Sequence, residues 1–442
     1  MAKVFDLVGA TIIDGTGGPV LPNASLRVRD GRVVAVWKDG DRPTDAKSPA
    51  DETVDVRGKT VMPGLIDAHC HISYGEGRTA EEVDVYGGAE WAAVRAVWNA
   101  NKVLQSGVTS FCDPGSTWNV AVTCRDAIES GMYPGPRVFA AGRHIVADGG
   151  FADYFPSWLG MPVSAEGVLC PTRDDMQREV RRQVKNRVDV VKISGDSQAQ
   201  ERVPTAGPCF TDQEMSCIVD EAHRLGRKVT IHSRYAETVL AAARAGVDWL
   251  IHASYMRPGD VGAVRDLQVP ICPTLTFTAN VVQHGRDVGV DPNYIETKRR
   301  ELDALVDIHR RALEAGIPMM AGSEAGFSVT PYGEWHTREL ELMVELLGMK
   351  PMDAILSATS INAKAFGWER DVGTLAPGLW ADLLVIDGDP LQDIRVLGDP
   401  ARIHAVYKGG QAVERSGALA TRRRMSHERG FAVSSTALHR LS

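Results

Sequence analysis

The pattern of apolar and polar positions divides the chain into two kinds of region. Near each end, short β-rich runs are separated by glycine-rich turns, and no helical period appears. Neither end carries enough apolar surface to form a stable sheet alone, and chain termini often lie close together. We therefore expect the two ends to pair into one small β-sandwich domain. Its predicted strands are residues 4–8, 11–13, 25–28, 33–37, 373–375, 381–386 and 404–408.

Between these ends, apolar runs alternate with segments of helical period. The predicted strands are residues 61–66, 109–112, 138–141, 189–193, 229–231, 249–251, 269–271 and 318–321. The predicted helices are residues 89–104, 173–187, 211–225, 237–245, 295–315 and 337–347. Eight strands with intervening helices predict an α/β fold, a (β/α)8 TIM barrel. A doubly wound sheet would alternate similarly, but the first strand does not lead into a glycine-rich phosphate loop.

These patterns predict a division of the chain into four segments. Residues 1–61 and 371–420 form the two parts of the β-sandwich, and residues 62–370 form the barrel. Residues 421–442 form a basic tail without periodicity, which is either flexible or a dimer arm.

Composition narrows the choice of partners and location. The 442 residues include 49 Lys+Arg and 57 Asp+Glu, which gives a net charge of −8 and argues against nucleic acid as a partner. No apolar run is long enough to span a membrane, and the start of the chain lacks the apolar block of a signal peptide. The seven cysteines are odd in number and widely spaced, which is typical of reduced thiols in the cytoplasm.

The strongest chemical signal follows the first strand of the barrel. His69 and His71 come directly after the apolar run 61–66. Residues i and i+2 of a strand point to the same face, so the two imidazoles lie together at the strand end where a barrel keeps its active site. Two convergent imidazoles are typical of a metal site, although this motif alone is common in other contexts.

Further potential ligands occur at the ends of later strands, and none in a strand middle. Each has an ordinary structural interpretation, such as a hydrogen-bonded buried histidine, a lysine reaching solvent or a helix cap. Their shared position nevertheless favours a metal centre at the mouth of the barrel. They are Lys192, His232, His252 and Glu324.

Beyond these residues, the sequence resembles the metal-dependent amidohydrolase superfamily over nearly its whole length. The resemblance is carried by Gly-Thr-Gly at 15–17, Val-Met-Pro-Gly-Leu-Ile-Asp-Ala-His-Cys-His at 61–71, Ser-Gly-Val-Thr at 106–109, Ala-Gly-Val-Asp at 245–248, Thr-x-x-Asn-Ala-Lys at 359–364 and Gly-Thr-Leu-Ala-Pro-Gly-x-x-Ala-Asp-Leu at 373–383. The branch it is most similar to is the prolidase-like and imidazolonepropionase-like one, which includes phenylurea and carbamate hydrolases.

The resemblance implies a binuclear metal centre. His69 and His71 correspond to ligands of the more buried metal, and His232 and His252 to ligands of the second. Lys192 corresponds to a lysine that reacts with CO2 to form a carbamate bridging two divalent ions. Zinc is the first expectation for these ions, with manganese, cobalt and iron as alternatives. The lysine must be deprotonated to react, and a desolvated strand end lowers its pKa.

One ligand departs from the family pattern. Where relatives have Thr-Asp at the eighth strand, this chain has Ser323-Glu324. The family aspartate binds the first metal and accepts the proton of the bridging hydroxide, so Glu324 is expected to be both catalytic base and ligand. The extra methylene leaves three alternatives: a retreated backbone, a base that does not ligate, or an unused carboxylate.

The substrate contacts also depart from the family. Phe151 replaces the histidine of a Gly-Gly-His motif, and His144 lies near enough in sequence to substitute for it. Arg234 and Tyr235 follow His232 where relatives have His-Ala-Tyr. The aromatic segment 151–159 predicts an apolar loop over the barrel mouth and an aromatic or bulky substrate, although plain packing explains these residues equally well.

The sequence therefore predicts a metal-dependent hydrolase that cleaves a C–N bond of a linear amide, urea or carbamate by attack of a metal-bridging hydroxide. Its partner is a small molecule, and a homo-oligomer is expected. A prolidase-like dipeptidase or an N-acyl amino acid hydrolase is an alternative. A cyclic-amide hydrolase or deaminase, or a non-catalytic binding module, is an alternative of another class. Lys192 argues against the mononuclear deaminases, which do not need it.

Overall fold

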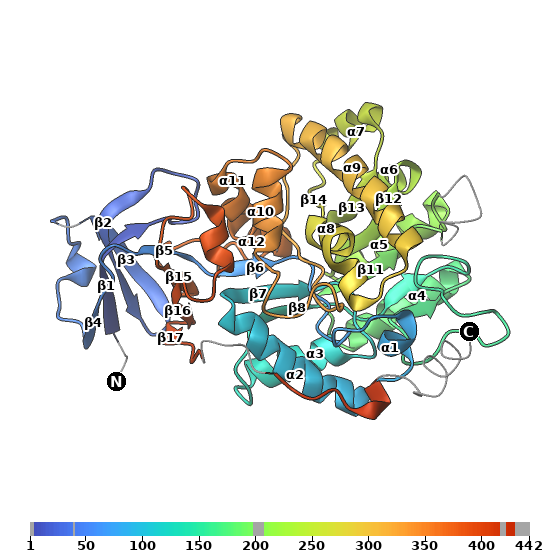
Figure 1. Cartoon of the computed structure of the whole chain (residues 1–442), viewed down its shortest axis with the longest axis horizontal. Coiled ribbons are helices and arrows are strands. Elements are labelled where there is room, and N and C mark those ends of the chain that lie inside the picture. Colours follow the sequence, from blue (N-terminus) through green and yellow to red (C-terminus); the bar gives the residue numbers. More distant parts are fainter. Residues whose placement is uncertain (1–3, 39, 198–206, 416–420, 429–442) are drawn as a thin grey trace.

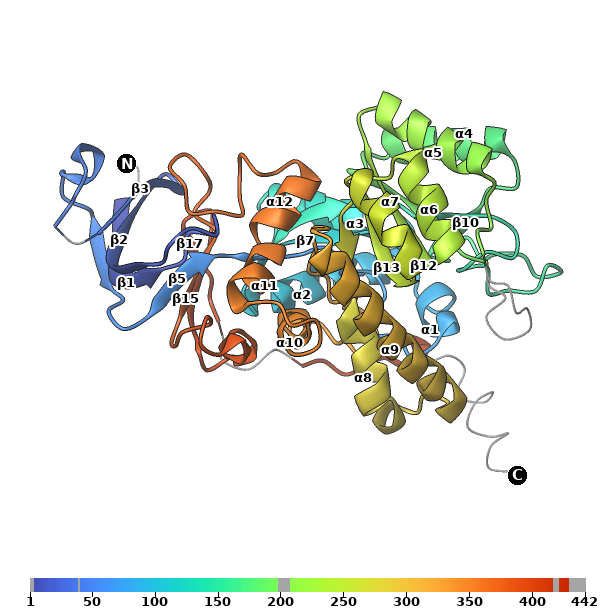
Figure 2. The same cartoon turned by 90° about the horizontal axis from the view of Figure 1, so that it is seen from above.

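A computed structural model describes residues 4–38, 40–197, 207–415 and 421–428. A barrel forms the larger part, and a β-sheet at one side of it contains strands from the N-terminal and C-terminal regions of the chain (Figures 1 and 2). Within the described residues, no helix combines the length and apolarity needed to cross a membrane.

Seven parallel strands and one short extended segment close the barrel. Strands β6, β7 and β8 pair in parallel, and so do β11, β12, β13 and β14. Bridges from Ala141 to Val190 and from Ile271 to Met319 join the two groups and add the eighth position. The amide of Ala68 then donates to the carbonyl of Ala321 over 2.8 Å and completes the ring. The strands are β6 (Leu65–Asp67), β7 (Val108–Asp113), β8 (Arg137–Ala140), β11 (Val190–Ser194), β12 (Lys228–Tyr235), β13 (Trp249–Tyr255) and β14 (Ile271–Cys272).

Helices cover the outside of the barrel with one apolar face each. In α2, buried Ala92, Ala96, Ala100 and Val103 recur at intervals of three or four residues. Helix α5 begins with a capping box in which Thr211 and Glu214 satisfy each other's free amides. The helices are α1 (Ala80–Asp84), α2 (Ala89–Gln105), α3 (Val120–Glu129), α4 (Arg173–Lys185), α5 (Asp212–Arg224), α6 (Ala236–Ala245), α7 (Val261–Asp266), α8 (Leu275–His284), α9 (Pro292–Glu314), α10 (Arg338–Glu345), α11 (Pro351–Ser357) and α12 (Ser360–Phe366).

Both chain ends contribute to one eight-stranded sheet. Strand β5 lies at the junction, because it pairs with β1 on one side and with β15 on the other. Phe5, Leu7, Leu26 and Val385 belong to its apolar core. The strands are β1 (Val4–Ile12), β2 (Leu21–Arg29), β3 (Arg32–Lys38), β4 (Glu52–Asp55), β5 (Thr60–Pro63), β15 (Leu383–Ile386), β16 (Ile403–Lys408) and β17 (Gln411–Ala412). Two further strands, β9 (His144–Val146) and β10 (Gly167–Leu169), extend the sheet of β11.

The predicted fold class is confirmed, and all six predicted helices are present as α2, α4, α5, α6, α9 and α10. The sequence analysis did not predict α3, α8 or the short helices. The predicted strand at 318–321 is only a bridge at Met319. The boundaries between the four predicted segments stay a prediction. Strand β5 crosses the first boundary, between residues 61 and 62.

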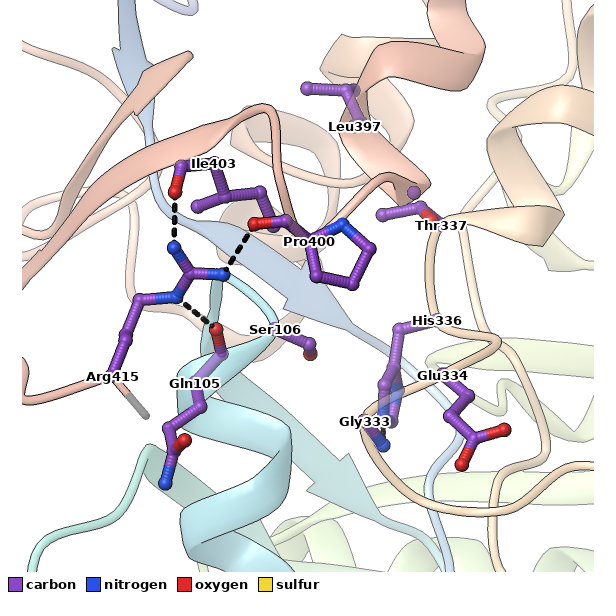
Figure 3. Close-up of a pocket in the computed structure, with 11 residues that line it drawn as sticks. Gln105, Ser106, Gly333, Glu334, His336, Thr337, Leu397, Pro400, Ile403 and Arg415 are labelled. Carbon is purple, nitrogen blue, oxygen red and sulfur yellow. Dashed lines mark hydrogen bonds between the residues drawn. The ribbon is translucent and has the colours of Figure 1, made fainter. Parts of the chain in front are cut away.

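A small cavity of about 30 Å³ lies between the barrel and the C-terminal segment (Figure 3). Arg415 donates to the backbone carbonyls of Gln105 and Pro400, and also to that of Ile403. Since this volume admits only about one water molecule, the cavity is a structural junction rather than a binding site.

The described part of the basic tail packs on the barrel. Glu428 forms ion pairs with Arg95 of α2, at 3.3 Å, and with Arg422, at 2.7 Å. Arg424 donates to the carbonyl of Glu76 over 2.8 Å. These contacts place residues 421–428 beside the segment that follows His71, and residues 429–442 lie outside the described residues.

Candidate metal centre

His69 and His71 direct the same ring nitrogen toward one point. Nδ1 of His71 lies 2.8 Å from the carbonyl of Gly115, and Nδ1 of His69 lies 3.1 Å from Oγ1 of Thr274. The Thr274 hydroxyl in turn donates to the carbonyl of Cys272. Both Nδ1 atoms are therefore donors, so the two Nε2 atoms, 2.9 Å apart, face each other as lone pairs. Such an arrangement is stabilised by a cation between or beside the two rings.

Glu324 completes this group with a carboxylate. Its ligand atoms and those of the two histidines all lie within 4.8 Å of one another, and all three residues are buried. Oε2 of Glu324 has no hydrogen-bond partner among the described residues, and burial raises the pKa of the carboxyl group. The residues present thus fit a divalent cation, because a buried carboxylate oxygen without a partner is costly unless a cation binds it.

The backbone is strained to present this carboxylate. Glu324 has a φ of 54°, in the left-handed region, and its amide donates to the carbonyl of His69 over 2.6 Å. A Cβ on Gly322, two residues before Glu324, would lie 2.7 Å from Cβ of His69 and 2.5 Å from Sγ of Cys272. Glycine therefore permits the close approach of the eighth segment to the first strand.

Asp67 ties the same two strand ends together. Its carboxylate accepts from the amide of His69 at 2.9 Å, and from the amide and hydroxyl of Ser323 at 3.0 and 2.5 Å. Nδ1 of His336 donates to it over 2.7 Å. This buried network fixes the positions of His69 and Glu324 relative to each other.

Lys192, His232 and His252 lie within β11, β12 and β13 and not at their last residues, because each strand continues beyond its predicted end. Lys192 is 1% exposed, and burial lowers its pKa to about 8. Nε2 of His252 has no partner among the described residues, and its φ of 74° is left-handed. The ring centroid of His252 lies 4.6 Å from that of His232 and 5.6 Å from that of His69. The structure thus brings all six predicted ligands to one end of the barrel.

The nitrogen Nε2 of His232 is engaged by a cationic side chain. Nη1 of Arg234 donates to it over 2.7 Å, while Nε of Arg234 pairs with Glu301 at 2.8 Å. A second cation on this nitrogen therefore requires Arg234 to move. His232 and Arg234 can contact each other because residues i and i+2 of a strand, here β12, point to the same face.

A cavity of about 210 Å³ opens onto these residues. His144 and Phe151, both predicted as substrate contacts, line it, and Phe151 stacks on the His232 ring at 3.9 Å. Arg234 lies 5.3 Å from the Phe151 ring and Tyr235 stacks on a neighbouring tyrosine, and neither is among the lining residues. In the predicted apolar loop, Trp158 is 83% exposed.

The sequence analysis did not identify three polar residues of this cavity, Tyr74, Asp84 and Glu166, and it placed Tyr154 only within the aromatic segment 151–159. Tyr74 lies in the loop after β6, and none of these residues belongs to a recognisable motif. Asp84 ends the short helix α1, and Glu166 precedes the short strand β10. Only the tertiary fold brings them to the histidines.

The geometry agrees with comparisons to known proteins. A family model described as "Amidohydrolase family" matches residues 60–413. Ochratoxinase from Aspergillus niger is 28% identical over 436 residues, which cover 93% of this chain and 86% of that protein. Its crystal structure has a TM-score of 0.83 at 24% identity, with 94% of this chain and 96% of that one covered.

A second solved structure is described as a prolidase complexed with N-methylphosphonate-L-proline. It has a TM-score of 0.82 at 26% identity and covers 94% of this chain and 100% of that one. An imidazolonepropionase from Symbiobacterium thermophilum is 23% identical over 438 residues, 92% of this chain and 94% of that protein. The family model matches well over half of the sequence, and the chain therefore belongs to the amidohydrolase family and is a hydrolase.

Proposed function

We propose that this hydrolase cleaves the C–N bond of a linear amide, urea or carbamate with an aromatic or bulky apolar part. The observation that carries the proposal is the convergence of the Nε2 atoms of His69 and His71 with the carboxylate of Glu324. The apolar part is supported by Phe151 and Phe327, which line the same cavity. Ochratoxinase and the prolidase give further support for a linear substrate.

We infer that two divalent cations bind here, with zinc the first expectation. His69, His71 and Glu324 would hold the first, and His232 and His252 the second, with carbamylated Lys192 shared between them. Such cations polarise the substrate carbonyl and lower the pKa of a water molecule. The lowered pKa of Lys192 supports carbamylation, since only the neutral amine reacts with CO2.

The chain's own residues then position and transfer protons. The carboxylate of Glu324 accepts the proton of the attacking water and returns it to the leaving nitrogen. Asp67 keeps this carboxylate opposite His69 through its bonds to Ser323. Phe151 and Phe327 keep bulk water from the reacting bond, which strengthens electrostatic interactions inside the cavity.

A prolidase-like dipeptidase or N-acyl amino acid hydrolase is the second candidate, favoured by the prolidase neighbour at 26% identity. Lys192 in β11 argues against a mononuclear deaminase. A homo-oligomer and a cytoplasmic location stay predictions, and the seven free cysteines are compatible with the latter.

The deciding experiment is metal analysis of protein purified without chelator, combined with hydrolysis assays on matched aryl amides, phenylureas, aryl carbamates, N-acyl amino acids and Xaa-Pro dipeptides. Two metal equivalents per chain and turnover of a linear substrate that is lost on chelation would support the proposal. A protein that binds no metal, or that hydrolyses only cyclic amides, would contradict it.

A further inference from the structure

Two carboxyl groups in the wall of the catalytic cavity have no role in the metal centre. Asp84, at the end of α1, and Glu166, before β10, both line this cavity. Oδ1 of Asp84 accepts a hydrogen bond from the backbone amide of Glu166 over 2.9 Å, so the two residues are direct neighbours. Asp84 is fully buried and Glu166 is 7% exposed.

This carboxyl pair lacks a cationic partner. Among the described residues, neither carboxylate lies within 4.0 Å of a lysine, arginine or histidine nitrogen, and Oδ2 of Asp84 has no hydrogen-bond partner. Arg143, which is near in space, donates instead to the backbone carbonyls of Ala165 and Pro162. A buried carboxylate oxygen facing a cavity without a partner is costly, and a ligand that donates hydrogen bonds would remove that cost.

The raised pKa values of the two carboxyl groups also favour a cationic ligand. Burial raises the pKa of Asp84 and of Glu166, and the Glu166 carboxylate raises the pKa of Asp84 further. The hydroxyls of Tyr74 and Tyr154 only partly offset this effect at Glu166. A cation placed between the two carboxyl groups would favour their ionised forms.

We propose that Asp84 and Glu166 form an ammonium-binding subsite, so that the preferred substrates are amides, ureas or carbamates that carry a protonated amine. This inference rests on the proposed function for the bond that is cleaved, but the subsite can be tested without turnover. The metal ligands and the carboxyl pair line one cavity of about 210 Å³. One small molecule can therefore reach both, with its scissile carbonyl at the histidines and its ammonium group at the pair.

The apolar lining sets what lies between these two ends. Ala80 and Val83 of α1, together with Phe327, line the cavity beside the carboxyl pair. Phe327 packs edge-on against Tyr74 with 5.3 Å between ring centroids. An arylalkyl amine therefore fits better than a fully hydrophilic cation such as a simple polyamine.

The first test measures binding alone. Calorimetry compares 2-phenylethylamine with its neutral analogue 2-phenylethanol, using the metal-loaded full chain. The amine is expected to bind roughly ten-fold tighter or more, the size expected for a charge-assisted hydrogen bond. Glu166→Gln and Asp84→Asn should each reduce this ratio toward one, while affinity for the alcohol stays the same. Equal affinities in the wild type, or a ratio unchanged in both variants, would overturn the subsite.

The control variant is Glu90→Gln, which makes the same chemical change at an exposed position on α2. Melting temperatures show whether each variant is folded. If Glu166→Gln or Asp84→Asn fails to fold, the affinity ratio of the other variant still tests the subsite, because both carboxyl groups belong to the same pair.

The second test separates the subsite from the proposed function. Phenylalanine anilide, with its free amine, is compared with its N-acetyl derivative and with 3-phenylpropananilide, which lacks the amine. A preference of roughly ten-fold or more in kcat/KM for the free amine, lost in Glu166→Gln, supports the subsite. Equal turnover of all three overturns the subsite but leaves the hydrolase proposal intact. Absence of turnover for every linear substrate contradicts the proposed function, and the calorimetric ratio then decides the subsite alone.

Discussion

Arg234 donates a hydrogen bond from Nη1 to Nε2 of His232, over 2.7 Å, in a fully buried setting. The guanidinium does not lose its proton at any ordinary pH, so it occupies a lone pair that a metal ion would use. By contrast, no such donor engages Nε2 of His252 in the described structure. The two histidines proposed to hold the second metal are therefore unequal in their readiness to bind a cation.

We predict that replacing Arg234 by methionine strengthens binding of the second metal. The change removes a charge and a competing donor but keeps the length of the side chain, while Glu301 retains its ion pair with Lys298 at 2.7 Å. Second-site affinity should rise by roughly ten-fold or more, because a like charge near a cation site disfavours binding. Metal titration with a competing chelator measures it, and Arg257→Met, at an exposed position, is the control. Unchanged affinity would show that Arg234 moves aside without cost.

Replacing His69 by alanine should remove the first metal. Its Nε2 atom faces Nε2 of His71 at 2.9 Å, so the variant leaves one imidazole where two converge. We expect elemental analysis to show about one equivalent less metal, and kcat/KM to fall by at least about 100-fold, more than the loss typical of a residue that only supports a ligand. His404→Ala changes an exposed histidine and should alter neither value. Full metal content in His69→Ala would contradict the ligand assignment.

The sequence predicted the ligands because a barrel converts position along the chain into position in space. His232 and His252 follow the apolar runs 229–231 and 249–251, which form consecutive parallel strands, so their convergence follows from the strand pattern. The prediction of a sheet built from both chain ends was possible for a related reason, since neither end could be stable without the other.

The carboxyl pair, the contact of Arg234 and the strained backbone positions could not be predicted, because they depend on contacts between segments without a regular sequence pattern. Asp84 and Glu166 meet through one hydrogen bond across 82 positions of sequence. Arg234 follows His232 by two residues, which puts both on one strand face, but only the structure shows that it binds the histidine rather than a substrate. The left-handed φ values at His252 and Glu324 could not be predicted either, since residues other than glycine adopt that conformation only rarely.

Lys192→Ala should abolish turnover, and a short carboxylic acid such as propionate should restore part of it. The lysine is buried, and its pKa is lowered to about 8, so a useful fraction is neutral and able to react with CO2 near neutral pH. A free carboxylate replaces the carbamate in the cavity left by the shortened side chain. Carbon-13 NMR of protein equilibrated with labelled bicarbonate should also show a carbamate signal that the variant lacks. A fully active variant would show that no carbamate is needed.

Gly322→Ala should damage the metal centre without replacing a ligand. Its Cβ would lie 2.7 Å from Cβ of His69 and 2.5 Å from Sγ of Cys272, so the eighth segment must shift away from β6. Overpacking of this kind costs about 1–3 kcal/mol of stability. We expect a lower melting temperature together with weaker binding of the first metal. Gly259→Ala is the matched control, because its Cβ meets nothing within 4 Å. Equal metal affinity in both variants would contradict a positioning role.

The last prediction concerns the pH dependence conferred by Glu324. Burial raises the pKa of this carboxyl group above its ordinary value of 4.5, so protonation removes the base at a higher pH than for an exposed glutamate. The profile of kcat/KM should therefore fall on the acidic side as pH decreases through that raised pKa, and should be flat above it until another group titrates.

Three variants test the assignment of this limb. Glu324→Gln keeps the size and removes the base, so kcat should fall by several orders of magnitude and the acidic limb should disappear. Glu324→Asp shortens the reach by about 1 Å, and activity should fall roughly 100-fold because the backbone here is held by the bond between the Glu324 amide and the His69 carbonyl. Glu334→Gln is the control, since Glu334 is exposed and lines the separate small cavity (Figure 3). A fully active Glu324→Asp would show that the longer side chain is a neutral variant. A fully active Glu324→Gln would assign the proton transfer to another buried carboxylate, of which Asp113, 3.6 Å from Nδ1 of His71, is the first to test.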